Sequence, residues 1–402
     1  MTTTQPAQGR HTFLFFLIYI AILGAFSSLV NDMYLPTIPS MMREFHTSPS
    51  MTQLGLSMTM LGLGIGSAIW GSLSDRYGRK PILLWSLAIF GLSTAVLVFS
   101  KTILFFVVMR LFQGFGAGGA MVLSYSIPAD RYSGRQLAKV MALVGAINGF
   151  APAVAPLAGG FMADVTGWRG IFVVLFVLGV FMLLWTTRRP ESLPPGERIS
   201  GKGLRAYAKA YGALFANGRF MLYVLIKAIG IGLLYAYISS APFIIQDRLH
   251  FSASAFGMIL GANAIAIALG STLVMRFKVL KTGLITGTCI MSLFAIGLGA
   301  VVYTGHGIVL FELMAVPMLL GSGMVFAAAN SLGMEVGRAD AGTASAILNV
   351  VKYVFAAVAA PLVGLGNMLH STGITFGAIA IIALILAAVA SRLKPLQSMI
   401  KQ

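Results

Sequence analysis

Gly71-Ser72-Leu73-Ser74-Asp75-Arg76-Tyr77-Gly78-Arg79-Lys80-Pro81 is a charged turn between two apolar stretches, residues 51–73 and 82–100. Each stretch has about 20 residues, which is enough to cross roughly 30 Å of hydrocarbon as a helix. An ordinary basic loop would need neither the single acid nor the glycines at this spacing. We therefore expect a gating element, in which ion pairs hold one face of the molecule closed in one conformational state. Its predicted members are Gly71, Asp75, Arg76, Gly78, Arg79 and Lys80.

The whole chain has the composition of an integral membrane protein. Of its 402 residues 58% are hydrophobic and only 10% are charged, and the mean hydropathy is +0.89. A water-soluble domain could not cover such a core with polar surface. Since only helices or closed barrels span a bilayer, and the apolar stretches have helical length, we expect an all-α fold with twelve transmembrane helices. The predicted spans are 12–36, 51–73, 82–100, 103–126, 138–162, 169–187, 220–244, 253–275, 283–303, 307–332, 342–366 and 371–391.

The net charge of +17 would suggest nucleic acid as the partner of a soluble protein, but its placement indicates a membrane topology instead. With both termini inside, 21 of the 28 basic residues fall on the cytoplasmic side, as the positive-inside rule requires. We therefore expect a multi-pass protein of a bacterial inner membrane that binds no nucleic acid. The cytoplasmic residues are Arg10, Arg76, Arg79, Lys80, Arg131, Arg135, Lys139, Arg188, Arg189, Arg198, Lys202, Arg205, Lys209, Arg219, Arg276, Lys278, Lys281, Arg338, Arg392, Lys394 and Lys401. Outside lie Arg43, Lys101, Arg169 and Arg248.

A polar segment, residues 188–219, divides the spans into two sets of six. It is rich in proline and basic residues, which is typical of a linker along an anionic membrane surface. The pair Gly71-Ser72 is repeated as Gly270-Ser271, an offset of 199 residues, and basic residues follow both pairs. This repetition predicts two six-helix pseudo-repeats, with an N-terminal bundle over 1–187 and a C-terminal bundle over 220–402.

Ionisable residues inside the spans are candidates for function, because a charge in hydrocarbon costs several kcal/mol unless it is paired or neutralised. Asp32 ends the first span, and Arg110 lies at a compatible depth in the fourth. We expect these two to pair, so that protonation of the acid would break the pair. The other readings are a carboxylate at a frayed helix end and an arginine that reaches the membrane surface. For Arg79 in the gating element, we expect Asp130 as a partner at the same membrane face.

Four segments resemble signatures of a known transporter family. The turn 71–81 resembles the G-x-L-a-D-r-x-G-r-k signature of the major facilitator superfamily, and Asp32-Met33-Tyr34-Leu35-Pro36 with Pro39 looks like the D-x-Y-L-P-x-x-P signature of its Bcr/CflA drug:proton antiporters. Arg110 with Gln113 and Gly114 is similar to the R-x-x-q-G motif of proton-coupled members. The resemblance implies proton-coupled efflux of small organic molecules or drugs by alternating access, with Asp32 and Arg110 in proton coupling.

The fifth span resembles the antiporter motif G-P-x-x-G-G, with Ala155 in place of the first glycine. Its prolines free backbone carbonyls and its glycines permit close helix contact. The resemblance implies export rather than import. The predicted residues of this antiporter helix are Gly149, Pro152, Pro156, Gly159 and Gly160.

Two lysines inside spans depart from what a pump for lipophilic cations would carry. If Lys227 and Lys352 face a central cavity, they favour an anionic or zwitterionic cargo; Lys227 is also close enough to the cytoplasmic end of its span to reach the surface. Glu312 is a further embedded acid, which we interpret as either functional or a structural cap. The residues expected to line a substrate cavity are Asn31, Tyr34, Gln113, Lys227, Tyr237, Phe243 and Lys352.

The sequence gives no sign of a catalytic, metal or nucleotide-binding site. The single cysteine, Cys289, is too few for a disulfide or a zinc site, and there is no nucleotide-binding loop. We expect no enzyme, no cofactor and a transporter that works as a monomer on small molecules and protons. Two alternatives stay open: a dedicated exporter of an endogenous, possibly anionic metabolite such as a metallophore or sugar, and a non-transporting membrane sensor. The five histidines lie at span ends or in loops: His11, His46, His250, His306 and His370.

Overall fold

The computed structural model describes residues 10–198, 211–304 and 307–393, and these residues contain helices and no strand. Some residues placed in the sequence analysis lie outside these ranges, namely Lys202, Arg205, Lys209, His306, Lys394 and Lys401. The all-α prediction is confirmed. The first six α-helices are α1 (Arg10–Asp32), the short α2 (Ile38–Glu44), α3 (Pro49–Tyr77), α4 (Arg79–Val98), α5 (Ile103–Arg131) and α6 (Gly134–Thr187). The remainder are α8 (Gly218–Pro242), α9 (Ala253–Leu273), α10 (Leu280–Thr304), α11 (Ile308–Val336), α12 (Ala341–Leu362) and α13 (Met368–Arg392).

Eleven helices of the described residues are long and apolar enough to cross a membrane, and one of them, α6, contains two predicted spans. At 54 residues α6 is far longer than one crossing requires. Gly167 interrupts it with φ 65°, a left-handed conformation that glycine adopts without steric cost. The chain therefore turns back at Gly167, and the predicted count of twelve spans is confirmed.

The first span ends earlier than predicted. α1 stops at Asp32, and a short 3-10 helix, η1 (Leu35–Thr37), leads into α2. Pro36 and Pro39 have no amide hydrogen to donate, so a continuous α-helix cannot extend through this segment. Asp32 consequently lies at a helix end, where the backbone changes direction.

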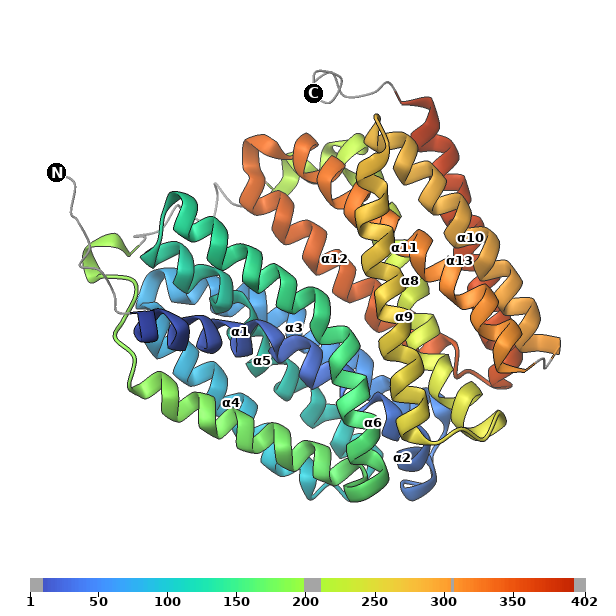
Figure 1. Ribbon diagram of the computed structural model, residues 1–402, viewed down its shortest axis with the longest axis horizontal. Helices are drawn as coiled ribbons and strands as arrows, with labels where there is room; N and C mark the ends of the chain where they lie inside the picture. The colour runs from blue at the N-terminus through green and yellow to red at the C-terminus, as the bar shows by residue number, and fades with distance from the viewer. Residues whose placement is uncertain (1–9, 199–210, 305–306, 394–402) are drawn as a thin grey trace.

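The helices gather into two groups. In Figure 1 the blue-to-green helices α1 to α6 lie together, and the yellow-to-red helices α8 to α13 lie beside them. The two groups touch where α6 packs against α9 and where α3 packs against α12. They converge at the end that carries α2 and separate toward the opposite end, where the turn 71–81 lies. Following the orientation expected from the charges, we call these the outer end and the cytoplasmic end. The exact domain boundaries stay a prediction.

Hydrogen bonds and an ion pair join the two groups at the outer end. Arg43 Nη1 lies 2.5 Å from Asp247 Oδ1, and Gln246 Nε2 donates to the carbonyl oxygen of Pro36 at 2.9 Å. Asp247 and Gln246 belong to η3 (Phe243–Arg248), a π-helical continuation of α8. The outer end is therefore closed by contacts between segments of different halves.

Close backbone packing reinforces this closure along α6 and α9. A Cβ added at Gly160 would lie 2.5 Å from the carbonyl oxygen of Ala253, and one added at Gly261 would lie 2.8 Å from that of Ala153. No side chain fits at either place without a shift of the backbone. Small residues thus let the two helices approach each other closely, as is common between helices in membranes.

The outer closure yields a first prediction. Gly160→Val should force α6 and α9 apart, because overpacking of this kind costs about 1–3 kcal/mol. The measurement is cross-linking of Arg43→Cys to Asp247→Cys by a short bismaleimide, in a Cys289→Ser background. We expect Gly160→Val to slow cross-linking by about tenfold, which corresponds to roughly 1.4 kcal/mol. The matched control is Gly377→Val, where an added Cβ meets nothing within 4 Å; equal rates in the two variants would contradict the prediction.

Candidate functional site in the central cavity

A cavity of about 970 Å³ lies between the two halves, and residues of both halves line it. Its volume is in the range of small-molecule sites, which are typically 300–1,000 Å³. The lining extends from Asp32 on α1 to Tyr125 on α5 and Asn349 on α12, toward the cytoplasmic end. Of the residues predicted for the cavity, coupling and antiporter helix, seven line it: Asn31, Asp32, Gly149, Pro152, Pro156, Tyr237 and Lys352.

Asp32 is a carboxylate on the cavity wall with a neutral partner. Asp32 is 8% exposed, and Asn31 Nδ2 donates to Asp32 Oδ1 at 3.0 Å. The same amide nitrogen lies 3.5 Å from the hydroxyl of Tyr235 on α8. The ion pairs found among the described residues do not include Asp32. A proton can therefore neutralise this carboxyl without breaking an ion pair.

The predicted pair between Asp32 and Arg110 is absent, so that prediction was wrong for this conformation. Arg110 is fully buried, and its Nη1 donates to the carbonyl oxygen of Val30 at 3.0 Å and to Gln113 Oε1 at 2.6 Å. The guanidinium carbon lies 4.1 Å from the centre of the Tyr34 ring. The physical reason lies in the end of α1: its last carbonyls have no helical donor, and a guanidinium satisfies one of them.

Three residues predicted for the cavity lie behind its wall instead. Tyr34 and Gln113 have no exposed surface and pack around Arg110. Gln113 Nε2 donates to Thr94 Oγ1 at 3.0 Å, which fixes it between α5 and α4. Phe243 begins η3 and is 5% exposed within the core. These three residues therefore pack behind the wall and are not among the described residues that line the cavity.

The two lysines occupy different positions. Lys352 lines the cavity, with its Nζ 4.3 Å from the centre of the Tyr353 ring. Lys227 is 7% exposed, is not among the described residues that line the cavity, and donates from Nζ to Asn330 Oδ1 at 2.7 Å. The prediction that Lys227 faces the cavity was wrong, because Asn330 on α11 holds it inside the helix bundle.

The residues of the predicted antiporter helix occupy two kinds of position. Gly149, Pro152 and Pro156 line the cavity. Gly159 packs on the backbone of Met33, and Gly160 on that of Ala253. The first part shapes the cavity and the second closes its outer end.

The gating element forms a network at the cytoplasmic end of the N-terminal half. Arg79 Nη1 lies 2.5 Å from Asp75 Oδ1, and Arg79 Nε lies 2.9 Å from Asp130 Oδ2, which is the predicted contact. Gly78 adopts φ 104°, so the chain turns sharply between α3 and α4. Glu191 Oε1 accepts from the backbone nitrogen of Arg79 at 2.9 Å and joins the linker to this turn.

The remaining members of the gating element lie at its edge. Lys80 Nζ donates to the carbonyl oxygen of Thr187 at 2.7 Å, and the guanidinium carbon of Arg76 lies 5.4 Å from the centre of the Tyr77 ring. An added Cβ at Gly71 would make only an ordinary contact, 3.4 Å from Val122. The prediction of ion pairs within this element is confirmed, and both of its pairs stay inside the N-terminal half.

The family model of the major facilitator superfamily matches residues 20–361 of the chain. The chain belongs to the major facilitator superfamily. The uncharacterized MFS-type transporter YdgK of Bacillus subtilis is 32% identical, with 97% of each chain covered. The bicyclomycin resistance protein homolog of Haemophilus influenzae is 26% identical over 89% of this chain and 90% of that protein. Multidrug resistance protein D of Escherichia coli is 27% identical over 89% of each. The resemblance to the drug:proton antiporter branch is thereby confirmed.

Solved structures confirm the facilitator fold. A bacterial homolog of the human lysosomal transporter Spinster, inward-facing and occupied, aligns with a TM-score of 0.74 at 17% identity, covering 96% of this chain and 98% of that one. A peptide transporter of the POT type aligns with a TM-score of 0.76 at 14% identity, covering 96% and 95%. At such identities the likeness concerns the fold alone.

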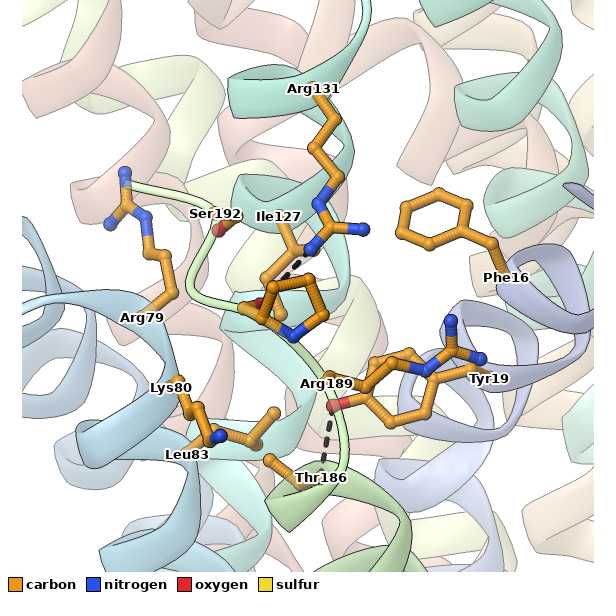
Figure 2. A pocket seen from close by; sticks show the side chains of 11 residues that line it. Phe16, Tyr19, Arg79, Lys80, Leu83, Ile127, Arg131, Thr186, Arg189 and Ser192 are labelled. Carbon is orange, nitrogen blue, oxygen red and sulfur yellow. Dashed lines mark hydrogen bonds between the residues drawn. The ribbon is translucent and has the colours of Figure 1, made fainter. Parts of the chain in front are cut away.

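A second, much smaller pocket of about 20 Å³ lies beside the gating element of this facilitator. Figure 2 shows Arg79, Lys80, Arg131 and Arg189 around it. Arg131 Nη2 donates to the carbonyl oxygen of Pro190 at 3.0 Å. Burial lowers the pKa of the Arg189 guanidinium from its ordinary value, yet arginine stays charged in proteins. Arg131 thereby joins the linker to α5, and Arg189 Nη2 joins it to α1 by donating to the carbonyl oxygen of Phe15 at 3.3 Å.

Sequence reasoning missed several polar residues of the cavity wall. Tyr235, Asn263 and Asn349 line it, as do Ser27 and Ser28. An asparagine within an apolar span is a signal that was available, since a buried amide requires hydrogen-bond partners.

The gating network yields a second prediction. Asp130→Ala removes one acid from a guanidinium whose side chain is only 10% exposed, so we expect the free energy of unfolding to fall by about 3 kcal/mol. Thermal melting in detergent measures the loss. The control, Asp247→Ala, breaks a pair whose side chains are 62% and 32% exposed, where about 0–1 kcal/mol is expected. Equal losses in the two variants would show that Arg79 does not depend on Asp130.

Proposed function

We propose that this facilitator exports small organic molecules, including drugs, in exchange for protons across the bacterial inner membrane. It works as a monomer without a cofactor, with both termini in the cytoplasm. The two halves rock against each other, so that the cavity opens alternately to the cytoplasm and to the outside. The open cytoplasmic end and the closed outer end correspond to the stage at which cargo enters the cavity.

The observation that carries this proposal is the position of Asp32. Its carboxyl reaches the cavity wall, has an amide as its hydrogen-bond donor, and makes no ion pair with the described residues. A carboxyl in such a place is stable either with a proton or with a bound donor or cation. Proton and cargo would therefore compete for it. Protonation from the outside releases the cargo, and loss of the proton to the cytoplasm restores affinity.

The nature of the cargo is supported by the relatives. Two of them are named for resistance to bicyclomycin and to multiple drugs. The cavity offers apolar walls, aromatic rings and a few polar groups, which suits varied small molecules. Bicyclomycin is therefore the first compound to test.

Asp32→Asn should abolish coupling between cargo and protons. The side chain keeps its size but cannot release a proton at any accessible pH. In inverted vesicles with an imposed proton gradient, bicyclomycin should dissipate the gradient for the natural protein and not for the variant, a loss of at least about tenfold in rate, as for other essential proton-transferring groups. Full coupling in the variant would refute the assignment of Asp32.

The control for this test is Asp340→Asn. Asp340 precedes α12 and is exposed, and its side chain makes no capping bond. This variant should retain both expression and coupling. A natural protein that confers no drug resistance in cells without their own exporters would instead favour a dedicated metabolite exporter.

One observation supports that second function. Lys352 places a cation on the same cavity wall as Asp32, which suits an anionic or zwitterionic cargo such as a metallophore or a charged sugar. Lys227 donates to Asn330 and is not among the described residues that line the cavity.

Lys352→Ala distinguishes the two functions. If the cargo is anionic, the variant should release about tenfold less of one metabolite into the medium, because a direct charge contact is worth roughly 1.5–3 kcal/mol. Untargeted metabolomics of the medium measures this loss, and Lys352→Arg should restore release. If the cargo is a cationic drug, Lys352→Ala should leave efflux unchanged or raise it.

A further inference from the structure

Glu312 is a second embedded carboxyl that the proposed transport cycle does not yet use. It is the fifth residue of α11, roughly 6 Å from the outer end of that helix at about 1.5 Å per residue. Its Oε2 accepts from Asn263 Nδ2 at 2.8 Å. Its Oε1 is buried and has no hydrogen-bond partner among the described residues. A buried carboxylate oxygen without a donor carries a free-energy cost that a bound proton would remove, so this arrangement points to a role in proton binding.

Asn263 connects Glu312 to the cavity. Its Nδ2 lies 2.8 Å from Glu312 Oε2 and 2.8 Å from the hydroxyl oxygen of Tyr237. Asn263 and Tyr237 line the cavity, whereas Glu312 is not among the lining residues that the structure describes. The carboxyl therefore lies behind the wall, between the cavity and the outer end, and one amide separates it from the tyrosine.

The same grouping occurs around Asp32. There the amide of Asn31 lies between Asp32 Oδ1, at 3.0 Å, and the hydroxyl of Tyr235, at 3.5 Å. Both groups consist of an acid, an asparagine and a tyrosine, and both tyrosines belong to α8. The cavity is thus bordered by two acid–asparagine–tyrosine triads.

We propose that Glu312 is a second proton-binding group of this transporter, and that Asn263 passes its protonation state to the hydroxyl of Tyr237 in the cavity. The proposal rests on the proposed proton coupling and extends it to the C-terminal half. It assigns Tyr237 as a group that binds a hydrogen-bond acceptor on the cargo.

The side-chain amide of Asn263 can transmit the protonation state of Glu312 to Tyr237. When Glu312 is ionised, the two hydrogens of Asn263 Nδ2 point at the carboxylate and at the Tyr237 oxygen, so the Tyr237 hydrogen is free for an acceptor in the cavity. A proton that binds Glu312 at Oε2 makes this oxygen a donor toward Asn263 instead of an acceptor. The amide then turns over, and its oxygen accepts from both Glu312 and Tyr237. The cargo loses the Tyr237 hydroxyl as its hydrogen-bond donor. The O–H bond of Glu312 is the covalent bond that this step forms.

The surroundings of Glu312 contain few groups that could titrate in its place. α8 contributes Tyr237, and α9 carries no charged residue. α10 carries Tyr303 at its outer end, which stacks on His370 of α13 with ring centres 4.9 Å apart. The charged residue of α10, Lys281, lies at its cytoplasmic end and donates to Ser391. On α11 itself the other acid, Glu335, is 23 positions away.

Infrared spectroscopy of the purified full-length protein in lipid nanodiscs tests the proton site without any cargo. As pH is lowered, the natural protein should show carbonyl bands of protonated carboxyls, and Glu312→Gln should remove one of them. Asn263→Ala should shift that band, because it removes the hydrogen bond, whereas Asn31→Ala should shift the band of Asp32. Glu335→Gln is the control. If Glu312→Gln removes no titrating band between about pH 5 and 8 although the protein elutes as folded, the proposal is overturned.

Binding of bicyclomycin tests the link to Tyr237. Affinity of the natural protein should fall as pH falls, and Tyr237→Phe should reduce this pH dependence by at least about threefold while the Glu312 band remains. An unchanged pH dependence would overturn the role of the hydroxyl. If bicyclomycin does not bind the natural protein at all, the proposed drug cargo is refuted. The infrared result still shows independently whether Glu312 binds a proton.

Discussion

The buried guanidinium of Arg110 is the interaction on which the N-terminal half depends. A fixed charge in hydrocarbon must find acceptors, and Arg110 finds them on several helices. It donates to Val30 at the end of α1, to Gly55 on α3 and to Gln113 on its own helix. Gln113 passes the contact on to Thr94 of α4, and Phe172 of α6 lies 5.6 Å from the guanidinium. One side chain thus fixes the relative positions of all five long helices in this half.

Because the hydrogen bonds of Arg110 Nε and Nη1 go to backbone carbonyls and an amide, the carboxyl of Asp32 is left with a neutral donor. The acids that bind Arg79 differ from Asp32 in this respect. Arg79 is held by two carboxylates, so its acids are committed to charge pairs and serve to fix the cytoplasmic turn. Asp32 has no such commitment and borders the cavity. The partners of an ionisable residue, rather than its burial alone, distinguish a structural charge from one that can exchange protons.

The sequence predicted the number of spans and the Arg79–Asp130 contact, because hydropathy and charge placement constrain which residues share a membrane depth. The prediction of an Asp32–Arg110 pair was wrong because it used depth alone. Depth along the membrane can be estimated from helical rise, but the direction in which a side chain leaves its helix depends on packing against neighbours. Lys227 shows the same limit: its partner Asn330 is 103 positions away, on a helix whose rotation the sequence does not specify.

The two triads differ in what they can sense. Tyr235 and Tyr237 are two residues apart on α8, so they point about 200° apart around the helix axis. Tyr237 contacts Asn263 within the C-terminal half, and this contact persists when the halves move as rigid bodies. Tyr235 instead contacts Asn31 across the halves, at 3.5 Å. A rocking motion that opens the outer end must change this contact, since it carries α8 away from α1. In the proposed cycle the triad of Asp32 therefore responds to the conformation of the transporter as well as to protonation, whereas the triad of Glu312 responds to protonation.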